Sequence, residues 1–151
     1  MKNEVVQLTI AAMALVAGGA AEELLPKAAG VGFPVLLMYS IFLATRRNTR
    51  SLFMFAVAAG AAEDALSGLP FATSIAFFAM AAAFVHTTGL VRSALALAYP
   101  VYQIWLRMWC ADLHGGVFGR FLAAFPAGVA TAAAVWWIAD WIERKGAVDE
   151  A

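Results

Sequence analysis

Six apolar stretches run along the chain, separated by short polar or turn-forming segments. They cover residues 5–21, 31–45, 51–66, 71–91, 94–112 and 121–142. A helix needs roughly 20 apolar residues to cross a hydrocarbon core about 30 Å thick. The stretches at 31–45 and 51–66 are short by that measure, so they are predicted to be partly re-entrant or to span where the bilayer thins. The pattern predicts an all-α integral membrane protein: a compact bundle of about six short transmembrane helices.

The connections between these stretches carry residues typical of turns. The third connection reads Ser67-Gly68-Leu69-Pro70. Gly68 suits the C-terminal cap of the third helix, and Pro70 suits the first turn of the fourth, where its missing N–H costs nothing. Because no linker, repeat or low-complexity tail interrupts the pattern, we expect one polytopic membrane domain over residues 1–151.

Composition agrees with a membrane environment. The chain is 64% hydrophobic and 13% charged, against roughly half and a quarter in soluble domains. The first apolar stretch follows Lys2, but Glu4 and Gln7 weaken a signal-peptide interpretation, and we expect this helix to be retained. The formal net charge of zero gives no support to nucleic-acid binding.

The positions of the basic residues predict the orientation, since short cytoplasmic loops retain lysine and arginine. With six crossings, one side of the membrane carries Lys2, Arg92, the basic loop Arg46, Arg47 and Arg50, and the tail residues Arg144 and Lys145. Both termini are therefore predicted to be cytoplasmic. The outer side then carries Glu22, Glu23, Asp112 and His114. Trp105, Trp109, Trp136, Trp137 and Trp141 are predicted to anchor the helices at the two interfaces.

Three ionisable residues fall at membrane depth: Glu63, Asp64 and Arg107. An unpaired charge there costs several kcal/mol, and the depths of the three residues are comparable. We therefore predict that Arg107 pairs with Asp64 or Glu63 inside the bundle. Because adjacent helical side chains diverge by about 100°, Glu63 and Asp64 are not expected to form a catalytic acid pair with each other.

No other residues point to an enzyme. His86 and His114 lie at opposite ends of the membrane in this topology, without cysteine or carboxylate partners at ligand spacing, so no metal site is predicted. Phosphate-binding glycine loops and serine nucleophile elbows are absent from the sequence. We expect a non-enzymatic protein without cofactors. Pro100, inside the fifth stretch, is predicted to bend its helix.

The third hairpin resembles a known motif. Residues 60–72, Gly-Ala-Ala-Glu-Asp-Ala-Leu-Ser-Gly-Leu-Pro-Phe-Ala, are similar to the hairpin of the rod shape-determining protein MreD family. In that family a glycine is followed after three residues by an aspartate, after two more by Ser-Gly, and usually by another glycine four residues on. Ala72 stands at that last position, where alanine also permits close packing. The family residues carried over are Gly60, Asp64, Ser67 and Gly68.

This resemblance implies a non-catalytic scaffold of the bacterial cell-elongation machinery, which builds the peptidoglycan side wall. The implied location is the inner membrane, as a multi-pass protein. The implied partners are an MreC-like bitopic protein, the elongation peptidoglycan synthase and, directly or indirectly, an MreB-like filament, with the lipid bilayer around them. Asp64 is the foremost candidate for function, as part of a partner-docking site.

A second family is also similar in length and helix number: the substrate-binding subunit of energy-coupling-factor vitamin transporters. That alternative requires an outward-facing pocket with several convergent polar groups. The polar residues near the outer face are few: Glu63, Asp64, Ser67, Gln103, Arg107, Asp112 and His114.

Overall fold

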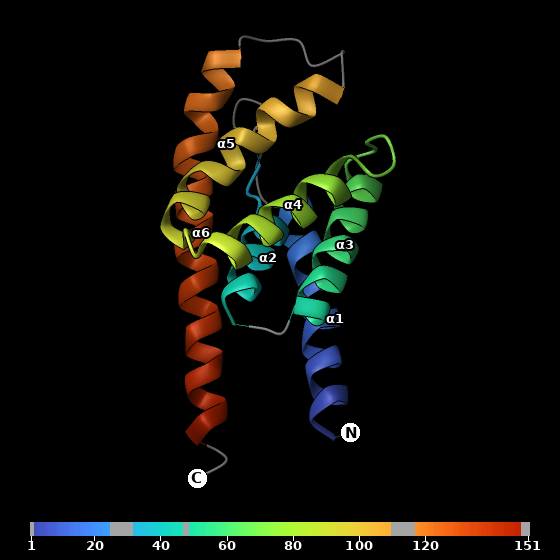
Figure 1. Ribbon diagram of the computed structural model, residues 1–151, viewed down its shortest axis with the longest axis vertical. Coiled ribbons are helices and arrows are strands. Elements are labelled where there is room, and N and C mark those ends of the chain that lie inside the picture. Colours follow the sequence, from blue (N-terminus) through green and yellow to red (C-terminus); the bar gives the residue numbers. More distant parts are fainter. Residues whose placement is uncertain (1, 25–31, 47–48, 110–116, 149–151) are drawn as a thin grey trace.

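The described part of the chain is entirely helical. The computed structural model describes residues 2–24, 32–46, 49–109 and 117–148, which form six helices and no strand (Figure 1). In chain order these are α1 (Lys2–Leu24), α2 (Val35–Arg46), α3 (Thr49–Leu66), α4 (Thr73–Thr88), α5 (Val91–Trp109) and α6 (Val117–Val148). The predicted helical class and number of helices are confirmed for these residues.

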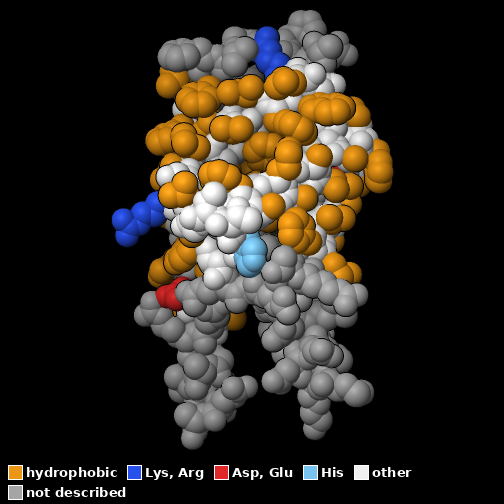
Figure 2. Space-filling view, in the orientation of Figure 1, with side chains coloured by type: hydrophobic (Ala, Val, Ile, Leu, Met, Phe, Trp, Pro, Cys, Tyr) orange, Lys and Arg blue, Asp and Glu red, His pale blue; other side chains and the backbone are white. Residues whose placement is uncertain are grey.

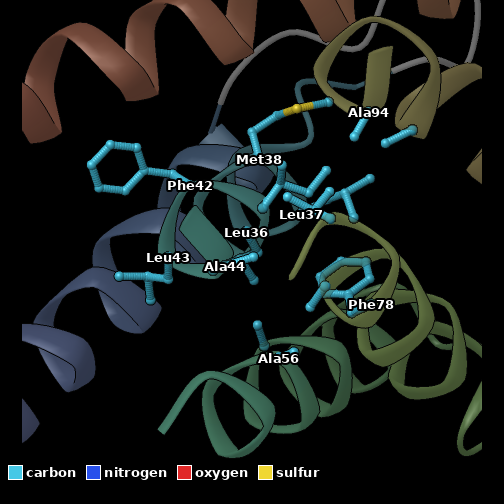
Figure 3. Packing of buried hydrophobic residues seen from close by; sticks show 14 of the residues in the cluster. Leu36, Leu37, Met38, Phe42, Leu43, Ala44, Ala56, Phe78 and Ala94 are labelled. Atoms are coloured by element: carbon cyan, nitrogen blue, oxygen red, sulfur yellow. The ribbon is translucent and has the colours of Figure 1, made fainter. Parts of the chain in front are cut away.

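The short helix α2 lies at the centre of the bundle. It packs against all five other helices, and its buried side chains include Leu36, Leu37, Met38, Ile41 and Phe42. Figure 3 shows Leu36, Leu37, Met38 and Phe42 pointing outward from α2 in several directions. Phe78 of α4 and Ala56 of α3 belong to the same buried cluster. A helix that is apolar all round is buried all round. This explains why a helix of only 12 residues is so hydrophobic.

The other helices pack around α2, and helices that are consecutive in the chain contact each other. The most extensive contacts join α3 to α4 and α5 to α6. In Figure 1 the two chain ends lie at the same end of the molecule, while α4 and α5 run obliquely to the long axis in its middle and upper parts. Small residues allow the close approaches: a Cβ on Gly128 of α6 would lie 3.0 Å from Cβ of Tyr99 of α5.

Of the two predictions for the third connection, the one for Gly68 is confirmed and the one for Pro70 is wrong. Gly68 has a left-handed backbone with φ of 61°, and the Leu69 N–H donates to the Asp64 carbonyl over 3.0 Å. This is the Schellman pattern, so the predicted cap is confirmed. Pro70, however, does not open α4: the helix begins at Thr73, and the Pro70 carbonyl accepts hydrogen bonds from the backbone and side chain of Thr73.

Two of the predicted interfacial tryptophans have internal roles. The Trp105 indole N–H donates to the Thr73 carbonyl over 2.9 Å, and the Trp136 ring packs edge-on against Phe42 with 5.0 Å between centroids. Trp109, Trp137 and Trp141 are exposed. Pro100 is buried, and α5 continues through it as one helix.

Only α6 passes a simple length-and-hydropathy test for crossing a membrane. Within the described residues, Phe121–Ile142 is long and apolar enough, whereas Val35–Thr45 and Thr73–Thr88 are apolar but shorter. With a rise of about 1.5 Å per residue, α2 is roughly 18 Å long, which agrees with the marginal length expected for the second stretch. Apolar side chains cover much of the described surface in the view of Figure 2. The exposed large apolar side chains of the described helices include Met54, Met80 and Phe84.

Candidate functional site

In the hairpin of α3 and α4, a carboxylate on α3 caps the N-terminus of α4. Ala72, at the N-cap position of α4, offers no side-chain acceptor. Asp64, in the last turn of α3, replaces it: its Oδ1 accepts a hydrogen bond of 2.7 Å from the Ser74 N–H. Asp64 is only 5% exposed. An acceptor at this place satisfies an amide that the helix leaves unpaired, and its charge suits the positive end of the helix dipole.

Close approach of the two helices makes this bond possible. A Cβ built on Gly60 would lie 2.5 Å from Cα of Ile75 and 2.8 Å from the carbonyl carbon of Ser74. These are backbone atoms, which cannot rotate away. Gly60 therefore allows the first turn of α4 to rest on α3 one helical turn before Asp64. The first turn of α4 is also tied to α5, because the hydroxyl groups of Ser74 and Tyr102 are hydrogen-bonded.

The start of α2 repeats the same arrangement. Glu22, in the last turn of α1, is 9% exposed, and its Oε1 accepts a hydrogen bond of 2.7 Å from the Leu36 N–H. Gly18 lies four residues earlier, and a Cβ there would be 2.7 Å from Cδ2 of Leu36. A glycine followed four residues later by a carboxylate thus packs on and caps the next helix in both hairpins.

This similarity is confined to the two helix caps and the glycines beside them. Gly-Ala-Ala-Glu followed by an acidic residue occurs at 19–23 and again at 60–64. This pattern is offset by one residue from the two caps, because it aligns Glu23, and not the capping Glu22, with Asp64. Sequence reasoning also left Glu22 outside the first stretch, as one of several outer-side charges. Its burial depends on where α2 begins, which the linear pattern placed at residue 31 and the structure places at Val35.

Glu22 and Glu63 bring two carboxyl groups together near the ends of α1 and α3. Their side chains line the same cavity and interact electrostatically, and Glu63 Oε1 accepts a hydrogen bond of 3.1 Å from the Ser67 hydroxyl. The second oxygen of Glu22, Oε2, is buried and receives no hydrogen bond from the described residues. Glu63 and Asp64 diverge as expected: Asp64 points to α4, whereas Glu63 meets Glu22.

A partly open cavity of about 150 Å³ adjoins this carboxyl pair. Its walls come from α1, the segment before α2, and helices α2 to α5. Its polar side chains are those of Glu22, Glu23, Glu63, Ser67, Tyr99, Tyr102 and Gln103. Tyr99, Gln103 and Gly32 lie together in the cavity wall. The cavity therefore combines carboxyl groups with aromatic and amide side chains.

The predicted motif residues separate into two kinds. Gly60 and Asp64 are buried within the hairpin, whereas Ser67 and Gly68 are exposed at its tip. The predicted ion pair between Arg107 and Asp64 or Glu63 stays a prediction. The hydrogen bonds that the structure gives Asp64 and Glu63 are with Ser74 and Ser67. In the basic loop, Arg47 and the side chains of Arg46 and Arg50 lie outside the described residues, as do Asp112 and His114.

Comparison with known proteins gave no relative. Neither a scan against protein-family models nor searches of curated proteins and of solved structures found a match. No metal site can be built either from the described residues, where no group of three or more His, Cys, Asp or Glu side chains is placed to hold an ion.

Proposed function

We propose that this protein is a non-catalytic, multi-pass scaffold of the bacterial inner membrane that serves cell elongation, as its resemblance to the MreD family implies. The observation that carries the proposal is the construction of the α3–α4 hairpin. Gly60, Asp64 and Gly68 each have a distinct task in fixing its shape: close packing, capping and chain reversal. A motif that rigidifies a hairpin fits a protein whose role is to present a surface.

The tip of this hairpin is the surface most suited to a partner. Phe71 is 88% exposed there, beside the exposed Ser67, Gly68 and Pro70. Aromatic side chains, phenylalanine among them, are enriched at protein–protein interfaces relative to the rest of the surface. Asp64 has a different part from the one expected, because its buried carboxylate shapes the hairpin and does not itself reach a partner. We propose that the tip contacts an MreC-like bitopic protein.

A lipid environment is supported by the exterior of the bundle. Exposed large apolar side chains occur on each described helix except the central α2, among them Met13, Val57, Phe84, Leu97 and Ile138. A monomeric soluble protein rarely exposes contiguous apolar surface on this scale. The short helices then span by local thinning of the bilayer. The shared position of the two chain ends in Figure 1 agrees with an even number of crossings.

Co-purification from the native bacterium in mild detergent tests the scaffold. We expect the tagged wild type to recover an MreC-like bitopic protein, and Phe71→Ala to lose it while remaining folded. Phe84→Ala is the matched control, since Phe84 is an exposed phenylalanine in the C-terminal half of α4. Equal recovery of the partner by both variants would reject the tip as the contact, and recovery of no elongation protein by the wild type would reject the scaffold.

A second function is favoured by one observation, the cavity beside Glu22 and Glu63. It gives the alternative, a substrate-binding subunit of a vitamin-type transporter, the polar pocket that it requires. Its volume of about 150 Å³ is below the range of roughly 300–1,000 Å³ usual for drug-sized ligands. Recovery of an ATPase pair with its membrane coupling subunit in the same experiment would favour transport over the scaffold.

A further inference from the structure

The cavity beside the carboxyl pair has the charge of a cation site. Three of the residues that line it are glutamates, and its described lining contains no Lys, Arg or His. Glu22 is the most deeply placed of the three: it is 9% exposed, and Glu23 is exposed at the rim. Carboxyl groups are rarely left buried without a compensating partner.

The two oxygens of Glu22 differ in their use. Oε1 caps α2 through the Leu36 N–H, while Oε2 is buried without a hydrogen bond from the described residues. It belongs to a side chain that lines the cavity and interacts electrostatically with Glu63. Two carboxylates so close repel each other unless a proton or a cation lies between them.

We propose that this cavity binds a primary ammonium group, held between the carboxyl groups of Glu22 and Glu63. An ammonium group has three N–H donors, and the side chains of Glu22, Glu63 and Gln103, which line the cavity, carry oxygens that can accept them. Such charge-assisted bonds are about twice as strong as neutral ones.

The walls of the cavity favour an organic cation over a metal ion. Phe33, Phe78, Tyr99 and Tyr102 contribute aromatic surface, which attracts ammonium groups through the ring quadrupole. The absence of a three-ligand cluster among the described residues disfavours a divalent metal. A cavity of about 150 Å³ is comparable to one that admits benzene, so it fits an ethanolamine-sized group. Both a free amine and the headgroup of phosphatidylethanolamine carry this chemistry.

Binding is tested on the purified full-length chain, so the result does not depend on the scaffold assignment. In detergent, thermal unfolding is followed against increasing ethanolamine. We expect a saturable rise of the unfolding midpoint, and an affinity about tenfold or more weaker in Glu22→Gln and in Glu63→Gln. Both variants retain a carbonyl oxygen for the Leu36 N–H or the Ser67 hydroxyl, so the helix ends remain satisfied. Choline, whose ammonium group has no N–H, is expected to bind more weakly.

Glu143→Gln is the control, because it removes the same charge from α6, which contributes no described residue to the cavity. It is expected to bind as the wild type does. A second arm compares nanodiscs of phosphatidylethanolamine with nanodiscs of phosphatidylcholine. Stabilisation by the former that is lost in Glu22→Gln assigns the site to a lipid headgroup, and binding of ethanolamine in detergent alone assigns it to a soluble amine.

Three results would overturn the proposal. One is a folded wild type that neither ethanolamine nor phosphatidylethanolamine stabilises. Another is a response in Glu22→Gln and in Glu63→Gln equal to that of the wild type, which would place the ligand elsewhere. The third is a response to Mg²⁺ or Ca²⁺ that ethanolamine does not reproduce, which would make this a metal site.

Discussion

Ala72 has a backbone conformation that its side chain disfavours. Its φ is 71°, in the left-handed region that costs an L-residue roughly 1–2 kcal/mol. In the MreD-like motif this position usually holds glycine, and close packing was the expected reason. The structure gives a different one, since glycine adopts a positive φ without a clash between Cβ and the backbone.

Ala72→Gly is therefore expected to stabilise the protein. The relief of the left-handed strain exceeds the extra entropy that glycine gives the unfolded chain, leaving a net gain of about 0.5–1 kcal/mol. The measurement is the midpoint of thermal unfolding in mild detergent. Ala76→Gly, inside α4, is the control and should destabilise by about 0.5–1 kcal/mol. A fall in stability for both variants would mean that Ala72 is not strained.

Asp64 is expected to matter for stability through its cap. Asp64→Ala removes the acceptor of the Ser74 N–H and should cost about 1–2 kcal/mol, seen as a lower unfolding midpoint. Asp64→Asn keeps an oxygen at that position and should cost less. Ser67→Ala, which removes only an exposed hydrogen bond to Glu63, is expected to change stability by less than about 0.5 kcal/mol. Equal effects of the three variants would contradict the capping role.

At the scale of the elements, helix contacts depend on where glycines lie. Gly60→Ala would force its Cβ against backbone atoms of Ser74 and Ile75, so α3 and α4 must separate. We expect a loss of roughly 2 kcal/mol or more and a lower yield of monodisperse protein in size-exclusion chromatography. Gly119→Ala is the matched control: no atom lies within 4 Å of its added Cβ, and alanine in a helix is favoured by about 0.5–1 kcal/mol.

The linear pattern was sufficient for the helices because apolar length and turn residues are local properties. The cap at Gly68 followed from its neighbours alone. The linear pattern did not predict the caps by Glu22 and Asp64. Glu22 bonds an amide 14 residues away, and Asp64 bonds one 10 residues away. In both cases the predicted start of the capped helix was wrong by two to four residues. Helix ends are the least reliable part of such predictions, and here the functional geometry lies at helix ends.

The same limit applied to the carboxyl groups. Considering Glu63 with its neighbour Asp64 correctly showed that they diverge on one helix. Finding the partner of Glu63 required the position of α1 relative to α3, where Gly19 allows the approach: its added Cβ would lie 3.0 Å from Cδ1 of Leu66. The hydropathy pattern along the chain does not show which non-consecutive helices contact each other.

For the whole molecule, the multi-pass proposal makes the two ends of α4 lie on opposite sides of the membrane. Ser67, before α4, and Thr88, at its C-terminal end, are both exposed. With Cys110 replaced by alanine, we expect Ser67→Cys in intact cells stripped of their outer membrane to react with a membrane-impermeant maleimide, and Thr88→Cys to react only after permeabilisation. The 16 residues of α4 span roughly 24 Å, so this helix is a demanding test of a thinned bilayer. Labelling of both positions from the same side would show that α4 does not cross, and would reduce the predicted six crossings while leaving the bundle itself intact.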